Sequence, residues 1–122
     1  MLFKKLLLGA ALLLPFTVNA ESPPSPKAYI IAEIEVIDAA AYEGYKSAVA
    51  PIVSKFGGRY IVRGGQMQAV EGDAPKDRVV VLEFDNLAAA RAFVESEEYR
   101  PVAEIRHKTA KSRVMIVEGI IP

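Results

Sequence analysis

The sequence predicts one α+β domain, built as a four-stranded antiparallel sheet with its helices on a single face. Three observations support this fold class. Apolar residues alternate with other residues over 29–37, which is the period of a strand. They recur at steps of three and four residues over 39–56, which is the period of a helix. A second round of strand, strand, helix and strand patterns follows, and this βαββαβ order is typical of two helices packed on one side of a sheet.

Residues 1–20 have the pattern of a secretory signal peptide. Lys4 and Lys5 form the positive start, an apolar run follows at 6–14, and small residues precede the expected cleavage site after Ala20. The alternative is an uncleaved membrane anchor. The apolar run is much shorter than the ~20 residues that a spanning helix needs, so we expect cleavage, no stable membrane insertion and a periplasmic or secreted mature protein.

The mature chain is expected to begin with a linker and to continue as one folded domain. Residues 21–27 are rich in proline, which favours an extended segment that does not pack. The folded domain is expected over 28–119. The chain has 15 basic and 15 acidic residues, and removal of Lys4 and Lys5 leaves 13 basic ones, for a net charge of −2.

Composition also limits the chemistry. The basic residues form no cluster of the kind that binds nucleic acid, so we expect no nucleic-acid partner. The chain has no cysteine and one histidine, His107. Disulfides, thiolate catalysis and cysteine- or histidine-based metal clusters are therefore excluded, and we expect no metal and no cofactor. His107 lies between Arg106 and Lys108, which favours a solvated helix end over a catalytic base.

The individual elements follow from local signals. Asp38 and Asn86 are suitable N-caps for helices, and the glycine pair at 57–58 is suited to end the first helix. Pro51 lies inside that helix pattern, where we expect a kink. A second glycine pair at 64–65 predicts a bulge or bend in the second strand. Strands are expected at 29–37, 59–63 with a continuation over 66–71, 78–84 and 112–118, and helices at 39–56, 87–95 and 96–108.

The two faces of the predicted sheet differ in character. The face under the helices is apolar and should carry Ile30, Ala32, Ile34, Val36, Tyr60, Val62, Val80, Leu82 and Phe84. The other face mixes Ile31, Ile61, Val79 and Val81 with Glu33, Glu35, Arg59, Arg63 and Glu83. Its aliphatic residues would form an exposed apolar patch, which usually marks an interaction surface. We therefore expect a homodimer packed through this face, with a solvated face as the alternative.

Arg63 is the leading candidate for ligand binding. It precedes the second glycine pair at a strand end, where a guanidinium can hold a carboxylate or enolate bidentately. The alternative is an ion pair between Arg63 and Glu83 on the neighbouring strand. Tyr45, Glu83 and Arg106 are further candidates to line a site, although a tyrosine on an apolar helix face is more often part of the core. No residue can be named as catalytic from the sequence.

The sequence also resembles a known family. The residues that carry the resemblance are Tyr45-Lys46, Ala50-Pro51, the run Gly57-Gly58-Arg59-Tyr60-Ile61-Val62-Arg63-Gly64-Gly65, Glu71-Gly72-Asp73, Val81-Leu82-Glu83-Phe84, Ala89-Ala90-Arg91-Ala92, Ser96-Glu97-Glu98-Tyr99, Ser112-Arg113 and Val117-Glu118-Gly119. They are similar to the domain-of-unknown-function family numbered 1330, over about 28–119.

This resemblance implies a ferredoxin-like fold of the dimeric α+β barrel superfamily, which includes cofactor-independent monooxygenases and isomerases. The family commonly has a histidine before the first glycine pair, where this chain has Phe56. A proton-transfer role at that position is therefore not expected here. We expect an exported homodimer that binds a small anionic or aromatic molecule between sheet and helices. The alternatives are a cofactor-independent enzyme of the same superfamily and a structural dimer without a ligand.

Overall fold

The computed structural model describes Leu13, Pro15 and residues 23–122. The predicted cleavage site at Ala20 and nearly all of the predicted signal peptide lie outside the described residues. Residues 23–27 contain neither helix nor strand. Among the residues that are described, no helix has the length and apolar character required to cross a membrane.

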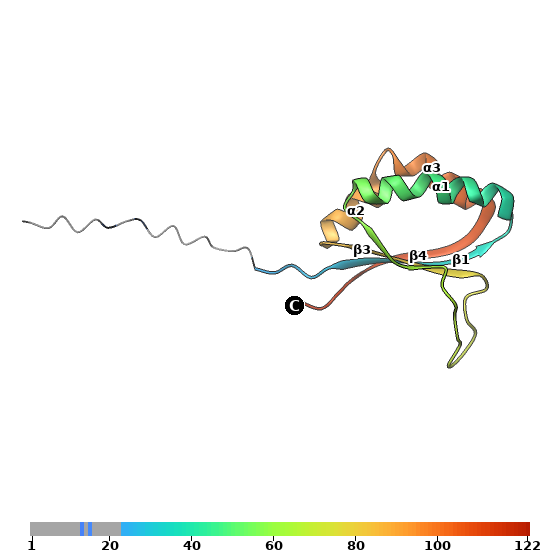
Figure 1. Cartoon of the computed structure of the whole chain (residues 1–122), viewed down its shortest axis with the longest axis horizontal. Coiled ribbons are helices and arrows are strands. Elements are labelled where there is room, and N and C mark those ends of the chain that lie inside the picture. Colours follow the sequence, from blue (N-terminus) through green and yellow to red (C-terminus); the bar gives the residue numbers. More distant parts are fainter. Residues whose placement is uncertain (1–12, 14, 16–22) are drawn as a thin grey trace, which may run out of the picture.

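The chain forms two layers, a four-stranded antiparallel sheet and a layer of helices on one of its faces (Figure 1). The elements follow the order β1 (Ala28–Val36), α1 (Ala39–Lys55), β2 (Arg59–Arg63), β3 (Arg78–Phe84), α2 (Leu87–Glu95), α3 (Tyr99–Thr109) and β4 (Ala110–Glu118). The strand order across the sheet is β2-β3-β1-β4. This arrangement confirms the predicted α+β fold with βαββαβ order.

Local capping explains where the helices begin and end. The Asp38 carboxylate accepts a hydrogen bond from the Ala41 amide at 3.1 Å, and Asn86 Oδ1 accepts one from the Ala89 amide at 2.8 Å. Gly57 follows α1 with a φ of 78°, a conformation that glycine adopts without strain. Helix α3 begins at Tyr99 rather than at Ser96, because the Ser96 hydroxyl lies before the helix and accepts from the Tyr99 amide at 3.1 Å.

The core lies between the helices and the covered face of the sheet. Strand β1 is central and contributes alternate residues, while α1 and α2 contribute aromatic and aliphatic side chains from above. The most deeply buried large side chains are Phe84, Phe93 and Val53. Phe84 and Phe93 have ring centroids 5.6 Å apart, and Phe93 and Tyr99 have centroids 4.5 Å apart. This aromatic cluster holds α2 and α3 against the end of the sheet.

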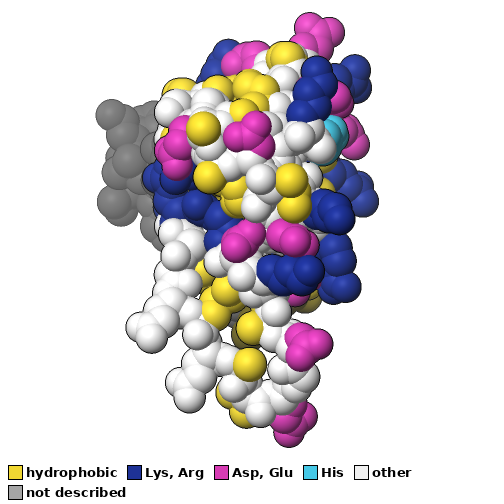
Figure 2. All heavy atoms as spheres, turned by 90° about the vertical axis from the view of Figure 1, so that its right-hand side faces the viewer, with side chains coloured by type: hydrophobic (Ala, Val, Ile, Leu, Met, Phe, Trp, Pro, Cys, Tyr) yellow, Lys and Arg dark blue, Asp and Glu magenta, His cyan; other side chains and the backbone are white. Residues whose placement is uncertain are grey.

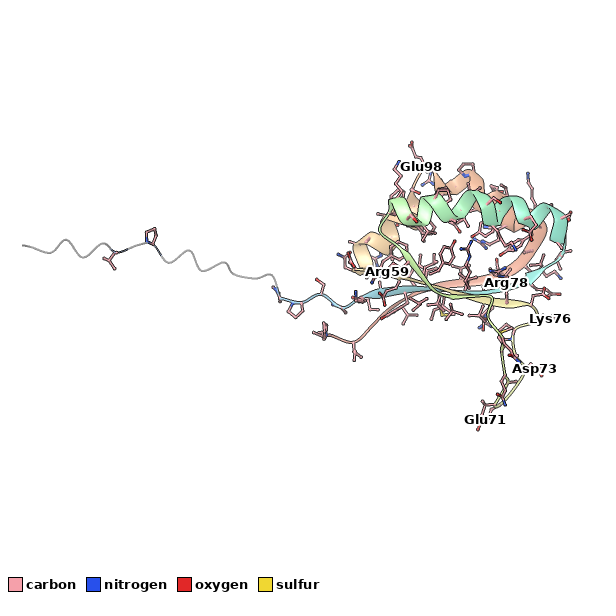
Figure 3. The ribbon with its side chains drawn as sticks, viewed as in Figure 1. Arg59, Glu71, Asp73, Lys76, Arg78 and Glu98 are labelled. Atoms are coloured by element: carbon pink, nitrogen blue, oxygen red, sulfur yellow. The ribbon has the colours of Figure 1, made fainter. Side chains whose placement is uncertain are left out.

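The expected continuation of the second strand over 66–71 is wrong. Residues 64–77 form a loop without helix or strand, and it projects from the sheet on the side away from the helices (Figures 1 and 3). Strand β2 is an edge strand of the sheet. Gly64, with a φ of 66°, turns the chain away from the sheet after β2. Glu71 and Asp73 lie toward the tip of this loop, and Val70 there is 90% exposed. Figure 2 shows apolar and acidic side chains side by side on this projection.

A bulge in β2 moves two residues to faces other than those expected. Tyr60 pairs with Leu82, whereas Val62 pairs with Val81 and Arg63 with Val80, so the register shifts between Tyr60 and Val62. The bulge therefore lies before the position predicted from Gly64-Gly65. The expected alternation placed Val62 under the helices and Arg63 on the open face. The extra residue reverses both placements, because side chains alternate strictly along a strand.

The open face of the sheet has an aliphatic centre and charged ends. Ile31 lies between Val81 on one neighbouring strand and Met115 on the other. At one end of the face, Arg113 Nε lies 3.0 Å from Glu33 Oε2. At the other end, Glu83 forms an ion pair with Arg59 and lies 3.7 Å from the Lys27 amine. Acidic and basic side chains on this face thus pair with one another within the sheet.

Candidate functional site

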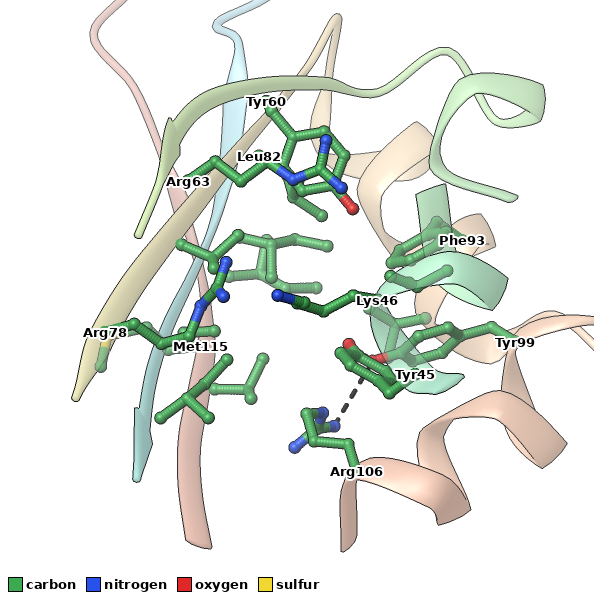
Figure 4. A pocket seen from close by; sticks show the side chains of 18 of the residues that line it. Tyr45, Lys46, Tyr60, Arg63, Arg78, Leu82, Phe93, Tyr99, Arg106 and Met115 are labelled. Atoms are coloured by element: carbon green, nitrogen blue, oxygen red, sulfur yellow. Dashed lines mark hydrogen bonds between the residues drawn. The ribbon is translucent and has the colours of Figure 1, made fainter. Parts of the chain in front are cut away.

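A cavity of about 230 Å³ lies between the sheet and helices α1 and α3 (Figure 4). Its apolar lining comes from all four strands and from the inward faces of the helices. The lining residues are Ile30, Ala32, Ile34, Tyr42, Tyr45, Lys46, Val49, Tyr60, Arg63, Arg78, Val80, Leu82, Phe93, Val94, Tyr99, Arg106, Val114, Met115 and Ile116. Four of these side chains are cationic and none is a carboxylate.

Arg63 reaches the cavity because of the bulge in β2. Its guanidinium carbon lies 4.2 Å from the centroid of the Tyr60 ring, which precedes it on the covered face. Stacking of this kind orients the planar guanidinium and leaves its N–H groups free to bind a ligand. The expected alternative, an ion pair between Arg63 and Glu83, is not present, because Glu83 pairs with Arg59 on the open face.

Arg78 is the first residue of β3 and shares the covered face with Val80 and Leu82. Its guanidinium passes close to the backbone of Gly64, where an added Cβ atom would lie 3.1 Å from Arg78 Cζ. The glycine at position 64 therefore provides space for this arginine as well as the turn out of β2. Arg78 Nε is buried and has no hydrogen-bond partner among the described residues.

Arg106 is the buried cation of the site, with 6% of the residue exposed. It comes from α3, donates a hydrogen bond to the Ser112 hydroxyl on β4, and places Nη2 3.4 Å from the Tyr99 hydroxyl. Tyr99 and Tyr45 hydroxyls lie 3.3 Å apart. Arg106 Nε is buried and finds no partner in the described part of the chain. Unpaired buried donors of this kind are uncommon in folded proteins, which makes this group a candidate for ligand contact.

The cationic character of the cavity is not neutralised by its own residues. Within residues 23–122, no carboxylate lies within 4.0 Å of Arg63, Arg78 or Arg106. Lys46 does have a partner, because its amine lies 2.8 Å from Glu43 on the next turn of α1. Three guanidinium groups therefore face the cavity without a counter-charge.

Tyr42, Tyr45 and Tyr60 stay in the neutral phenol form at physiological pH. Burial raises the pKa of Tyr42 and Tyr60, and nearby arginines only partly oppose this effect. Burial, with the neighbouring Tyr99 oxygen as a second cause, also raises the pKa of Tyr45. Burial alone would lower the pKa of Arg106, but the oxygens of Tyr99 and Tyr45 outweigh it and the pKa is raised. The site thus offers neutral hydroxyl donors beside a guanidinium that keeps its charge.

The structure brings together three of the four residues that the sequence suggested for a ligand site. Tyr45, Arg63 and Arg106 line the cavity. Glu83 does not, because it lies on the open face of the sheet between Arg59 and Lys27. Its position follows from alternation along β3, in which the flanking residues Leu82 and Phe84 point into the core.

Sequence reasoning missed two cations of the site. Lys46 follows Tyr42 by four residues and precedes Val49 by three, so helical spacing places it on the apolar stripe of α1. Arg78 lies two residues before Val80, so strand spacing places it on the covered face. Both spacings can be read from the sequence. A charged residue at an otherwise apolar position is, however, easily taken to lie at the solvent-exposed border of that face rather than in a cavity.

The residues of this cavity indicate neither acid–base catalysis by a histidine nor metal binding. His107 lies outside it, exposed on α3, with Nδ1 3.1 Å from Glu104 Oε1. Phe56, which stands where the family commonly has a histidine, packs edge-on against Phe93 with centroids 6.2 Å apart. The described residues contain no cluster of three or more potential metal ligands. What the cavity offers is a set of fixed cationic and hydroxyl donors around an apolar space, suited to hold an anion.

Comparison with solved structures shows the same fold in proteins of low sequence identity. A protein of unknown function from Rhodopseudomonas palustris is 19% identical, with a TM-score of 0.64 over 80% of this chain and 85% of that one. A dimeric protein of unknown function with a ferredoxin-like fold, from Bacteroides fragilis, is 17% identical, with a TM-score of 0.52 over 75% and 95%. A candidate antibiotic biosynthesis monooxygenase from Nitrosomonas europaea is 16% identical, with a TM-score of 0.50 over 80% and 94%.

These likenesses establish a ferredoxin-like fold. Among curated proteins, no sequence matches the chain. A family model matches residues 27–120, which include every helix and strand described above and the whole segment, about 28–119, that the sequence resemblance covered. The chain belongs to the family described as a domain of unknown function, DUF1330.

Proposed function

We propose that this protein binds a small organic anion with an apolar or aromatic body in the cavity between sheet and helices. The observation that carries this proposal is the composition of the lining, which has four cationic side chains and no carboxylate. Charge-assisted hydrogen bonds to a guanidinium are strong, and they are stronger where water is largely excluded. The aliphatic and aromatic lining would contact the rest of the ligand.

The alternative of a cofactor-independent oxygenase or isomerase is less well supported by this lining. Such chemistry usually begins with removal of a proton by a positioned base. The cavity has no imidazole or carboxylate, and burial raises the pKa of Tyr42, Tyr45 and Tyr60. The geometry therefore favours binding over proton transfer.

We also propose that two copies associate through the open faces of their sheets. Aliphatic side chains on this face are exposed, with Ile61 51% exposed and Met115 41% exposed. Its carboxylates Glu33 and Glu83 already have cationic partners within the chain, so burial of the face would not leave them unpaired. The likeness to a dimeric protein of the same fold supports association of two copies.

Export is proposed on the sequence of residues 1–20 alone. Mass measurement of the protein expressed in a bacterium with its full leader tests this step. A periplasmic product that begins at Glu21 would agree with the proposal, and a full-length product in the membrane or cytoplasm would contradict it.

Anion binding can be tested by titrating the protein with benzoate and with benzamide, its uncharged analogue, in a calorimeter. We expect benzoate to bind and benzamide to bind much more weakly. Replacement of Arg63 by Gln should weaken benzoate binding by about tenfold or more, because a hydrogen bond to a charged group is lost. The matched control is Arg59→Gln, on the same strand but the opposite face, which should leave binding unchanged. Equal binding of benzoate and benzamide would contradict the proposal.

A further inference from the structure

The register of the sheet places the cations of the cavity in two groups. Arg78 on β3, Ile34 on β1 and Ser112 on β4 stand in one row across the covered face. Arg106 donates to Ser112, so it lies at the β4 end of this row, whereas Arg78 lies at the β3 end. Neighbouring strands are about 4.8 Å apart, so the backbones at the two ends of the row are separated by about 10 Å.

One group lies toward the open side of the cavity and is called here the outer anion site, formed by Lys46, Arg63 and Arg78. Arg63 pairs with Val80, two residues from Arg78, so these arginines are diagonal neighbours on β2 and β3. Arg63 is exposed, and Lys46 and Arg78 are half-buried. Figure 4 shows Arg63 on the side of the cavity opposite Arg106, with Lys46 from α1 and Arg78 from the sheet pointing toward one another between them.

The other group is called here the inner anion site, formed by Tyr45, Tyr99 and Arg106. Arg106 is almost completely buried, and its Nε has no partner among the described residues. Its hydrogen bonds are to hydroxyl groups, on Ser112 and Tyr99, and not to a carboxylate. The inner anion site is therefore a buried positive charge without a counter-ion, which is costly unless a ligand supplies one.

The space between the two groups is apolar. Ala32 and Ile34 on the central strand form its base, and both line the cavity. The backbones that carry the two groups of cations lie at opposite ends of the row through Ile34. A ligand with an acid group at each end of its apolar part would compensate both groups.

We propose that the ligand class is a two-ended dianion, in which two acid groups flank a short apolar or aromatic centre, as in an aromatic or medium-chain dicarboxylate. This inference rests on the proposed function and specifies its ligand. One acid group binds the outer anion site and the other binds the inner anion site. The apolar centre lies over Ala32 and Ile34.

The test compares benzoate, terephthalate and sulfate as probes, by calorimetric titration of the intact protein at pH 7. Benzoate and terephthalate share the aromatic ring and differ in one carboxylate, while sulfate carries two charges in a compact group. We expect terephthalate to bind about tenfold more tightly than benzoate, from the added charge-assisted contacts. We expect sulfate to bind less tightly than terephthalate.

Variants then test which cations bind each acid group of the ligand. Arg106→Gln should reduce terephthalate affinity to about that of benzoate, and so should Arg78→Gln at the other end, which provides a second variant if the buried position does not tolerate the change. Arg91→Gln on the exposed face of α2, outside the cavity, is the matched control and should preserve the preference. Far-ultraviolet circular dichroism verifies folding of each variant.

Two results would overturn the inference in different ways. If terephthalate and benzoate bind equally well, or sulfate binds as tightly as terephthalate, the two-ended ligand is wrong while anion binding stands. If none of the three probes binds, the proposed function itself fails. A terephthalate preference that survives both Arg106→Gln and Arg78→Gln would also contradict the assignment of the two ends.

Discussion

Single residues control how closely the first helix approaches the sheet. Gly58 follows α1 and lies against the core, where an added Cβ atom would stand 2.7 Å from the Phe84 ring and 2.9 Å from Val53. Both neighbours are fully buried and cannot move aside easily. Gly44, in contrast, lies within α1 with no atom within 4 Å of an added Cβ. The two glycines therefore have different structural roles.

Replacement of these glycines by alanine should change stability in opposite directions. Gly58→Ala should lower the free energy of unfolding by about 1–3 kcal/mol, because the methyl group overpacks the core. Gly44→Ala should raise it by about 0.5–1 kcal/mol, because alanine has the higher helix propensity. Urea denaturation of both variants measures the difference. A neutral Gly58→Ala variant would show that the helix can shift away from Phe84 at little cost.

The ion pair of Glu83 predicts how stability depends on pH. A hydrogen bond from Arg59 holds the pKa of the Glu83 carboxyl below its usual value. Because the pKa is lower in the folded than in the unfolded state, this stabilisation is present above the unfolded value of about 4.3. It is lost as the pH falls through the lower, folded value.

Urea denaturation at pH values from 6 to 3 tests this dependence. We expect the free energy of unfolding to fall less steeply with acid in Glu83→Gln than in the original protein. Glu95→Gln is the control, since Glu95 forms no ion pair among the described residues. If both variants keep the original slope, the Arg59–Glu83 pair contributes nothing measurable in solution.

At the scale of elements, strand β2 shows what periodicity can and cannot predict. The periods of β1, α1 and β3 placed these elements to within one or two residues, because each has a strong apolar pattern. Strand β2 is short and lies at an edge, so its register is fixed by pairing with β3 rather than by its own sequence. The position of the bulge and the absence of a continuation over 66–71 were therefore not predictable, and the misplaced bulge put Arg63 on the wrong face.

Part of the candidate site could be predicted where the apolar pattern of an element is strong. Tyr45 and Arg106 lie on helices whose spacing indicates an inward face, and the structure places both in the cavity. Arg63 was proposed as a ligand-binding residue because glycines follow it in the sequence. It reaches the cavity only because the bulge places it on the covered face. Glu83 was proposed because it was expected to lie beside Arg63 on the neighbouring strand. The same bulge places the two side chains on opposite faces of the sheet.

Deletion of Ile61 tests whether this residue is the extra one that forms the bulge. Without it, Tyr60, Val62 and Arg63 should alternate regularly and keep their partners on β3, so Arg63 should stay on the covered face. We expect benzoate binding to be retained while the circular dichroism spectrum stays unchanged. Deletion of Ala69 in the exposed loop is the control for loss of one residue and should also leave binding intact. Benzoate binding that is lost on deletion of Ile61 but kept on deletion of Ala69 would contradict this description of the bulge.

At the scale of the whole molecule, the charges of the two sheet faces are organised differently. On the open face, Glu33, Glu35 and Glu83 all have a cationic partner within the chain. On the covered face, Arg63, Arg78 and Arg106 have no anionic partner in the described part of the chain. Carboxylates that are paired with cations around an aliphatic centre suit an interface with a second copy of the chain. Guanidinium groups without an anionic partner around a cavity suit an anionic ligand.

The proposed dimer predicts the effect of a charge placed at the centre of the open face. Ile31 lies on the central strand between Val81 and Met115, so Ile31→Glu would bury an unpaired carboxylate in the interface. We expect this variant to be monomeric by sedimentation equilibrium at concentrations at which the original protein is a dimer. Ile37→Glu is the matched control, because Ile37 follows β1 and is already 60% exposed. An original protein that sediments as a monomer would show that this face is solvated, and a dimer that persists in Ile31→Glu would place the interface elsewhere.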